Sequence, residues 1–517
     1  MSYAGNSFTI NDFSGGLNSN SAVTELDLNE ALDESNVIVG PSGSFFRTRY
    51  GDTEFNASAM NSGANVQGLG YAKFTSADDF LVAVCGNMLF RSATGLGGTM
   101  SDISGVLTIT AGQNNIWTQF TFNDVHLGFG GPATNPDAPW SWTGSGNAAV
   151  LGGSPPSAYG AFHANNRVFA FRTAANPSRI LWSILGNQAD WTGTGSGNAD
   201  IWTSDNDSLT AAAVMDNSTV LLFKENSIHK MIISQLVSSA FPIYPIVKGS
   251  GCVGKHACVV ADGLCYFITS QGRMKITDGE RIYDDKDYPN LASMDDLWSA
   301  TNSSRWQYTQ GMRVVGADYD QIWWAVSSSS SQTTNNWKFI WDLKNRCWLR
   351  DKTGYAVNVA TTTQAGIPYG GHTNGKIYKK DVSTATTDAS NSSTQIDSYW
   401  TSGWIKENSL EKIKQPRKAN LSFVSQSSGN IQFSWGFDFN SATQTTSIDQ
   451  RVNAGVWGQG MWGSMVWGGA TDLIRPIRIT GRGNVFQYRI RNIDSKMKIN
   501  SLEFSGKVYG QKELAAR

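Results

Sequence analysis

The chain has 517 residues, of which 53 are glycine and only 16% are charged. A chain of this length exceeds the size at which one hydrophobic core stops growing, so we expect two or three substructures or one repeat-built body with additions. The net charge of −1 excludes the overall positive field that draws proteins to nucleic acid or to anionic membranes, and any contact with DNA must be weak or local.

Short apolar runs separated by Gly, Ser, Thr and Asn are typical of many short strands joined by turns, so the sequence predicts an all-β protein. The cysteines lie mostly within such apolar runs, which favours buried free thiols over disulfides. The N-terminus lacks the basic flank and apolar core of a signal peptide, and no uninterrupted run of 18 apolar residues predicts a membrane span. We therefore expect a protein that is made and folds in a cytoplasm.

Residues 1–60 are expected to form an N-terminal arm. The sequence SFTINDF is typical of a strand, and Gly15-Gly16 predicts a turn. Asp27 and Glu30 have the spacing of a capping box, which predicts about two turns of helix over residues 28–36.

Residues 61–385 repeat one local pattern: an apolar strand, a turn that carries Gly or Asn, and a second strand. Seven such segments begin near residues 80, 125, 167, 219, 263, 321 and 369, about 48 residues apart, which is close to the spacing of propeller blades. A four-stranded blade buries its faces only by stacking on neighbouring blades, so six to eight of them close into a ring. The pattern favours a β-propeller over a sandwich or a run of hairpins without a central axis.

Residues 386–517 are expected to form a separate β-sandwich-like domain. The domain begins within a polar stretch, residues 382–395, that predicts a linker or exposed loop. From residue 471 onward ten Lys and Arg face four acidic residues, so this segment could dock on an acidic partner or simply form a solvated β face. Arg478, Arg489 and Arg491 are the candidate interface residues within it.

Three tryptophans, Trp457, Trp462 and Trp467, recur at intervals of five residues, each followed by glycine. Neither a strand nor a helix turns such positions to one surface, so the pairs are typical of turn corners. They could form an internal plug, a sugar-stacking surface or a subunit interface. We favour an interface, where tryptophan is enriched among the residues that carry binding energy.

Two motifs suggest ligands but do not fit them. The sequence GSGCVGKH (249–256) nearly matches a phosphate-binding loop, yet His256 stands where Ser or Thr should bind Mg²⁺, and strands rather than a helix follow. Cys252, His256, Cys258 and Cys265 lack the short ligand spacing of a structural zinc site, so core thiols are the simpler interpretation.

Three acidic residues, Asp284, Asp285 and Asp287, could supply a glycosidase pair, but their sequence, IYDDKDYPN, is more typical of a solvated turn. No nucleophile elbow of the form G-x-S-x-G is present. The residues alone therefore predict no catalytic site, no metal and no cofactor.

In chain order, several short motifs resemble one family. FSGGLN (13–18), LDLNEALDESNVIV and FRTRYG (46–51) occur near the N-terminus. NNRVFAF, SRILWS, LLFKENSIHKM and GCVGKHACVVADGLCYFITSQGRMKITDG follow, and YRIRN and INSLEFSG lie near the C-terminus. Together they resemble the tail nozzle or tail-stabilisation proteins of short-tailed bacteriophages (podoviruses). The Trp-Gly run has no counterpart in this resemblance.

The resemblance implies a propeller-containing virion subunit that forms a hexameric ring below the portal and adaptor (head-to-tail connector) rings, assembled in the host cytoplasm. Its N- and C-terminal segments would join into a β-rich platform that docks on the ring above. Viral DNA would pass through the lumen without sequence recognition, tail fibre or needle proteins would be further partners, and no enzymatic activity is implied. The alternative is a glycan-binding or polysaccharide-degrading propeller of a virion or cell surface.

Overall fold

The computed structural model describes residues 6–509 except 77, 235–239, 353–356, 407–409, 427, 452–471 and 494. Strands account for nearly all the regular structure, and the described helices are α1 (Asp295–Ala300) and five 3₁₀ segments, η1 (Pro41–Gly43), η2 (Met60–Gly63), η3 (Thr203–Asp205), η4 (Ser303–Tyr308) and η5 (Ala389–Asn391). None of the helices in the described ranges is long and apolar enough to cross a membrane.

Six antiparallel sheets of four consecutive strands form the first six blades of a propeller. Blades 1 to 3 are β7 (Val66–Lys73), β8 (Asp79–Cys85), β9 (Met88–Ala93), β10 (Gly97–Asp102); β11 (Trp117–Phe122), β12 (Val125–Gly130), β13 (Trp140–Trp142), β14 (Ala149–Val150); and β15 (Ala158–Ala164), β16 (Arg167–Thr173), β17 (Arg179–Trp182), β18 (Gly197–Asp200). Blades 4 to 6 are β19 (Leu209–Val214), β20 (Thr219–Lys224), β21 (Ser227–Ile232), β22 (Ile243–Lys248); β23 (Cys258–Ala261), β24 (Leu264–Ile268), β25 (Met274–Thr277), β26 (Ile282–Tyr283); and β27 (Gln310–Val315), β28 (Asp320–Val326), β29 (Trp337–Asp342), β30 (Cys347–Asp351).

The seventh blade closes the ring with strands from distant parts of the chain. It contains β31 (Val357–Thr362), β32 (Pro368–His372) and β33 (Ile377–Val382), and β33 pairs with β6 (Gly51–Glu54). Two short strands, β34 (Thr387–Asp388) and β35 (Thr394–Gln395), extend this sheet beyond β6. Hydrogen bonds between an N-terminal strand and the last blade therefore fasten the ring.

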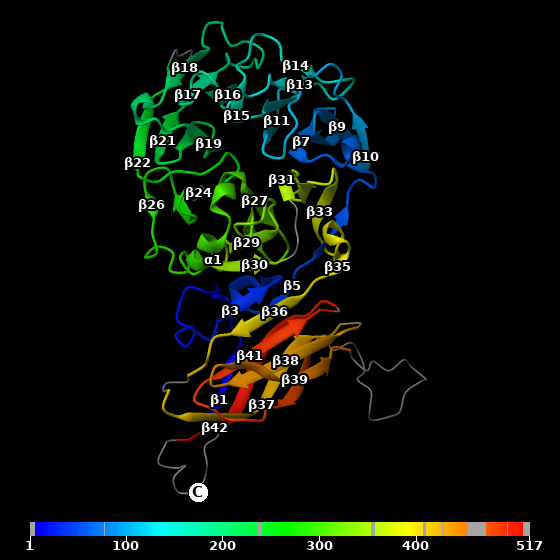
Figure 1. The fold of residues 1–517 in the computed structure, drawn as a ribbon, viewed down its shortest axis with the longest axis vertical. Helices are drawn as coiled ribbons and strands as arrows, with labels where there is room; N and C mark the ends of the chain where they lie inside the picture. Colours follow the sequence, from blue (N-terminus) through cyan, green and yellow to red (C-terminus); the bar gives the residue numbers. More distant parts are fainter. Residues whose placement is uncertain are drawn as a thin grey trace.

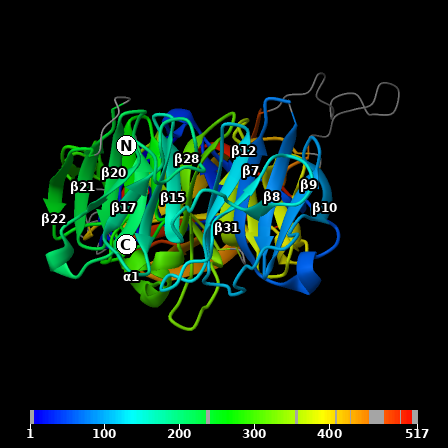
Figure 2. The same ribbon diagram turned by 90° about the horizontal axis from the view of Figure 1, so that it is seen from above.

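The blades stand around a common axis (Figure 1). The first strand of each blade contacts the first strand of the next all the way around, and β31 contacts β7. Seen from above, the strands run across the thickness of the disc (Figure 2). The predicted propeller is confirmed, and the seven segments recognised in the sequence each contain the second strand of one blade.

Both ends of the chain build a second body, the platform, which lies against the rim of the propeller (Figure 1). One of its two six-stranded sheets contains β1 (Asn6–Ile10), β4 (Val37–Val39), β5 (Phe46–Thr48), β37 (Ile413–Val424), β40 (Asp472–Arg478) and β42 (Lys498–Tyr509). The other contains β2 (Gly16–Leu17), β3 (Glu30–Ser35), β36 (Ser398–Ser402), β38 (Asn430–Phe437), β39 (Asn440–Asp449) and β41 (Phe486–Asn492). The predicted sandwich-like platform is therefore confirmed.

Aromatic side chains fill the space between the two platform sheets. Phe46 of β5 stacks on Trp400 of β36 with 5.3 Å between ring centroids, and Phe13 packs edge-on against both rings. The same hydrophobic core continues into blade 6 through Trp323 and Ile340. The platform and the propeller therefore share one core rather than touching through a solvated surface.

The predicted helix over residues 28–36 is wrong. The Asp27 amide does donate to the Glu30 carboxylate at 3.0 Å, but this contact closes a turn, after which β3 pairs antiparallel with β36. Pairing with a strand almost 370 residues away overrides the local helix signal, as tertiary context often does.

Candidate functional site at the platform–propeller junction

The outer edge of blade 6 is covered by the platform. All five residues of β30 are buried, whereas the outer strands β10, β14, β18, β22 and β26 of blades 1 to 5 are exposed or half-buried. The Asn36 amide donates to the Arg350 carbonyl at 2.9 Å, so platform backbone satisfies part of this edge. Covering a strand edge removes unpaired backbone groups from solvent and fixes what lies on it.

Gly16 lets the platform approach β30 closely. Its φ is +64°, and a Cβ there would lie 2.5 Å from the Trp348 carbonyl and 2.8 Å from Cys347 Sγ. Only glycine combines this left-handed conformation with so little space. The glycine pair expected to form a turn is thus also a contact point between the two bodies.

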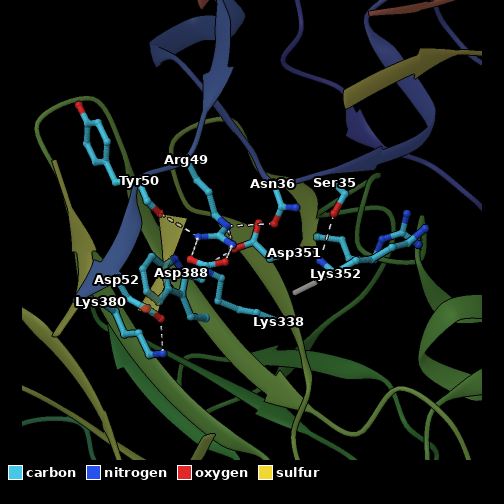
Figure 3. Close-up of polar contacts among 12 residues, drawn as sticks. Ser35, Asn36, Arg49, Tyr50, Asp52, Lys338, Asp351, Lys352, Lys380 and Asp388 are labelled. Carbon is cyan, nitrogen blue, oxygen red and sulfur yellow. Dashed lines mark hydrogen bonds and ion pairs between the residues drawn. The ribbon is translucent and has the colours of Figure 1, made fainter. Parts of the chain in front are cut away.

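Arg49, which follows β5, lies at the centre of a buried ionic cluster (Figure 3). Its guanidinium donates to both carboxylate oxygens of Asp388, at 2.8 and 2.6 Å, and to Asn36 Oδ1 at 2.9 Å. Its Nε also lies 3.2 Å from the carboxylate of Asp351 in β30. A two-pronged pairing of this kind fixes orientation as well as charge, so Arg49 joins the platform strand to blades 6 and 7.

Two buried lysines balance the remaining carboxylates (Figure 3). Lys338 lies 2.6 Å from Asp351, and Lys380 lies 2.7 Å from Asp52. Burial lowers the pKa of both lysines, against the pull of their carboxylates. Burial alone would raise the pKa of Asp52, but contacts with Lys380 and Ser390 bring it below its ordinary value. The cluster therefore holds its charges as matched pairs.

Glu34 is fully buried at the same junction. One carboxyl oxygen accepts the amide of Arg350, and the other has no hydrogen-bond partner among the described residues. Burial raises the pKa of Glu34 well above its usual value of 4.5. Burial at this position therefore disfavours the charged form of the Glu34 carboxyl.

The junction is shaped as a rigid joint rather than as a ligand site. A cavity of about 10 Å³ lies beside Arg49, Asp52 and Lys380, which is room for at most one water molecule. Its charges already satisfy one another, so little is left to bind or transform a substrate.

Lys255, from the sequence that resembles a phosphate-binding loop, links blades across the propeller axis. It is buried, and its ammonium donates to the carbonyls of Ile116 and Tyr159 at 2.6 and 2.5 Å. It also lies 3.9 Å from the ring centroid of Tyr159. Because Lys255 follows blade 4 in the chain while its partners belong to the start of blades 2 and 3, it reaches across the axis and is unavailable to a phosphate.

The other chemical candidates also have structural roles. Cys252 is buried and donates to the carbonyls of Gly254 and Ala257, and all five cysteines are free, as predicted. Within the described ranges no group of three or more His, Cys, Asp or Glu side chains is placed to hold a metal ion. Asp284 and Asp287 are exposed turn residues.

The predicted interface residues do not share one surface. Arg489 and Arg491 lie on the outward face of β41, where Arg489 packs 4.1 Å over the Tyr399 ring and Arg491 pairs with Asp397 at 2.8 Å. Arg478 is exposed on β40, in the other sheet. Trp457, Trp462 and Trp467 lie outside the described residues.

The polar stretch over residues 382–395 is not simply the exposed linker that the sequence predicts. Asp388 within it is completely buried against Arg49, and Ser390 donates to Asp52. The composition of this stretch does not predict the burial of Asp388, because its partner, Arg49, is more than 300 residues away. Arg49 belongs to FRTRYG, which is one of the motifs that carry the resemblance, but the motif did not predict the ion pairs of Arg49.

Comparisons with known proteins bear only on the fold and not on the function. No family model matches the chain, and no curated protein matches it. Its structural neighbours include the WD40 propeller domain of Doa1 (11% identity, TM-score 0.41, covering 65% of this chain and 100% of that one) and YCF48 bound to D1 peptide (10%, 0.41, 64% and 99%). BamB from Moraxella catarrhalis is another (11%, 0.34, 63% and 99%). Such distant similarities carry no functional argument, and the propeller assignment rests on the sheets themselves.

Proposed function

We propose that this protein is a structural subunit of a short bacteriophage tail, in which copies of the chain form a hexameric nozzle ring around the path of the ejected DNA. The propeller would be a stiff wall element and the platform the part that meets other subunits. The subunit would be a virion component with no chemistry of its own.

The buried joint between platform and propeller carries this proposal. The two ends of the chain combine into one body, and Arg49 locks this body onto blade 6 through Asp351 and onto blade 7 through Asp388. Such a chain transmits force without bending at a linker. Such rigidity suits a passive load-bearing part better than an enzyme that must open and close around a substrate.

Two further features agree with a conduit made by several copies. Lys255 bridges blades across the propeller axis, so the DNA path would run between copies instead of through one propeller. A chain of net charge −1 could line that path without gripping the DNA. The motifs FSGGLN and FRTRYG, on which the resemblance depends, both contribute to the junction.

Electron microscopy of the full-length chain, alone and mixed with the adaptor complex of the same virion, tests this proposal. We expect a chain that is monomeric or weakly associated alone and that forms a ring on the adaptor, with docked fibre or needle proteins as later additions. Failure to bind any adaptor assembly would contradict it.

A glycan-binding or polysaccharide-degrading propeller is the second candidate. A polar cavity of about 500 Å³ beside Trp202, Asp205, Asp207 and Lys248 is the feature that favours it. However, Lys248 lies 4.5 Å from the Trp202 ring centroid, and His229 packs against the same ring. Quenching of tryptophan fluorescence by cell-wall sugar, lost in Trp202→Ala, would support this alternative.

A further inference from the structure

One edge of the platform carries a cluster of exposed cations that the fold itself does not explain. We call it the basic edge; it lies on β37, β40 and the segment after β40, and comprises Arg417, Lys418, Arg475, Arg478 and Arg482. Among the described residues no carboxylate forms a salt bridge with any of these five side chains. Arg475 contributes a smaller, longer-range attraction that helps to lower the pKa of Asp449.

Within the basic edge, like charges face each other directly. Lys418 of β37 is paired in register with Arg478 of β40. Like charges directly opposite each other destabilise a sheet, and an anionic group lying over them would relieve that repulsion. Ile474, on the same strand, is 66% exposed. An acidic partner with an apolar component therefore fits this edge.

The opposite side of the platform carries negative charge, which is complementary to the basic edge. We call it the acidic flank; it lies in and beside the loop between β2 and β3 and comprises Asp12, Glu25, Asp27 and Asp296. Residues 19–30 contain no basic residue. Val23 and Leu28 of this loop are 38% and 44% exposed. Lys406 neutralises Glu25, which leaves a net negative surface with exposed aliphatic side chains.

The two surfaces lie on opposite sides of one body. β40 is the last strand of its sheet, and β2 and β39 are the two ends of the other sheet. Because Phe46 of β5 stacks on Trp400 of β36, the β2 and β3 side of one sheet lies over the β4 and β5 side of the other. Figure 1 shows β3 on the left of the platform and β39 on the right.

We infer that the basic edge of one copy binds the acidic flank of the next copy, so that the platforms join head to tail. This contact deepens the proposed function and rests on it. Complementary surfaces on opposite sides of a subunit generate a closed ring when the rotation between copies closes. Pro476 lacks an N–H in the middle of β40, so side chains rather than an added strand make the contact.

Duplex DNA is a less suitable occupant for the basic edge. Phosphate binding would explain the cations but would leave Ile474 exposed to a polar backbone. An acidic flank that carries Val23 and Leu28 accounts for both the charge and the exposed isoleucine.

Cross-linking of the concentrated full-length chain tests the contact. Leu28→Cys is mixed with Ile474→Cys and treated with a short bis-maleimide; the matched control pairs Leu28→Cys with Val106→Cys, a propeller position that is 91% exposed. Wild-type chain reports any reaction of its own cysteines, which are buried or half-buried. We expect dimers and higher multimers with Ile474→Cys and at least a tenfold smaller yield with Val106→Cys. Equal yields, or no cross-link either in the concentrated chain or in rings assembled on the adaptor complex, overturn the inference.

Charge exchange gives a second readout. Lys418→Glu with Arg478→Glu should lower the cross-link yield about tenfold or more, and adding Glu25→Lys with Asp27→Lys should restore it, because the attraction is reversed rather than removed. Lys73→Glu, an exposed change on blade 1, should have no effect. If the first pair of changes lowers retention of duplex DNA or of the adaptor and leaves the cross-link unchanged, the basic edge serves that partner and the inference is wrong.

The failure of this contact and the failure of the proposed function are distinguishable. Rings in electron micrographs without a cross-link between residues 28 and 474 would overturn the contact and leave the nozzle proposal standing. Specific cross-links within open filaments would support the contact and contradict the nozzle.

Discussion

Replacing Arg49 with methionine removes the central cation of the junction while keeping most of its volume. Arg49 and Asp388 have side chains that are 4% and 0% exposed, so solvent screens this pair very little. Removing one partner of a buried pair leaves an uncompensated charge and costs about 3–5 kcal/mol. Asp351 retains Lys338 at 2.6 Å, so most of the loss should come from Asp388. We expect the free energy of unfolding to fall by that amount.

The double variant Arg49→Met with Asp388→Leu separates charge burial from packing. It removes both charges, and apolar replacements for buried pairs are often neutral or stabilising. We therefore expect it to lie within about 1–2 kcal/mol of the wild type, more stable than Arg49→Met alone. Urea denaturation followed by circular dichroism measures both values.

A matched control uses the exposed pair of Arg179 and Asp200 on blade 3, whose side chains are 28% and 40% exposed. Arg179→Met should cost no more than about 1 kcal/mol. If Arg49→Met costs no more than Arg179→Met, the junction is not the rigid joint described above.

Four further outcomes follow from burial. Gly16→Ala should destabilise the protein by at least about 1–2 kcal/mol in urea denaturation, from its left-handed backbone alone. Gly95 is also left-handed, but a Cβ there would meet nothing within 4 Å. The difference in stability between Gly16→Ala and Gly95→Ala therefore measures the added effect of contact with Trp348. Burial lowers the pKa of His126 to about 3, so the folded state binds fewer protons, and this residue alone should lower the stability by about 1.4 kcal/mol per pH unit below pH 6.5. His126→Gln should reduce the acid slope of stability by that amount, while the other buried histidines keep their share. The pKa of Glu34 is raised, so the wild type should lose stability relative to Glu34→Gln as the pH rises above 4.5, and equal pH profiles would contradict the raised pKa. Lys255→Ala should cost about 2–4 kcal/mol through two unsatisfied carbonyls, with faster amide exchange near Ile116.

The propeller was predictable because each blade repeats the same local sequence pattern. Apolar alternating strands around a Gly or Asn turn recur at blade spacing, and stacking requires a ring. The seventh blade was only partly visible in the sequence, since β6 lies more than 320 residues before β33. Local patterns carry no information about such pairing.

The junction was the least predictable part of the fold. Glu34 lies in a stretch that local spacing assigns to a helix, and Asp388 lies in a polar stretch that composition assigns to a linker. Both assignments fail because the deciding partners, Arg350 and Arg49, are distant in sequence. Of the three predicted interface arginines, Arg478 belongs to the proposed contact between copies, whereas an interface at Arg489 and Arg491 stays a prediction.

Imaging the full-length chain assembled on the adaptor complex of its virion, in the presence of duplex DNA, tests the central claim most directly. The account predicts a closed ring with DNA density in the space between copies and none along the propeller axes, where Lys255 lies. DNA density through a propeller axis, or single copies that remain separate and release sugar from a polysaccharide, would contradict it.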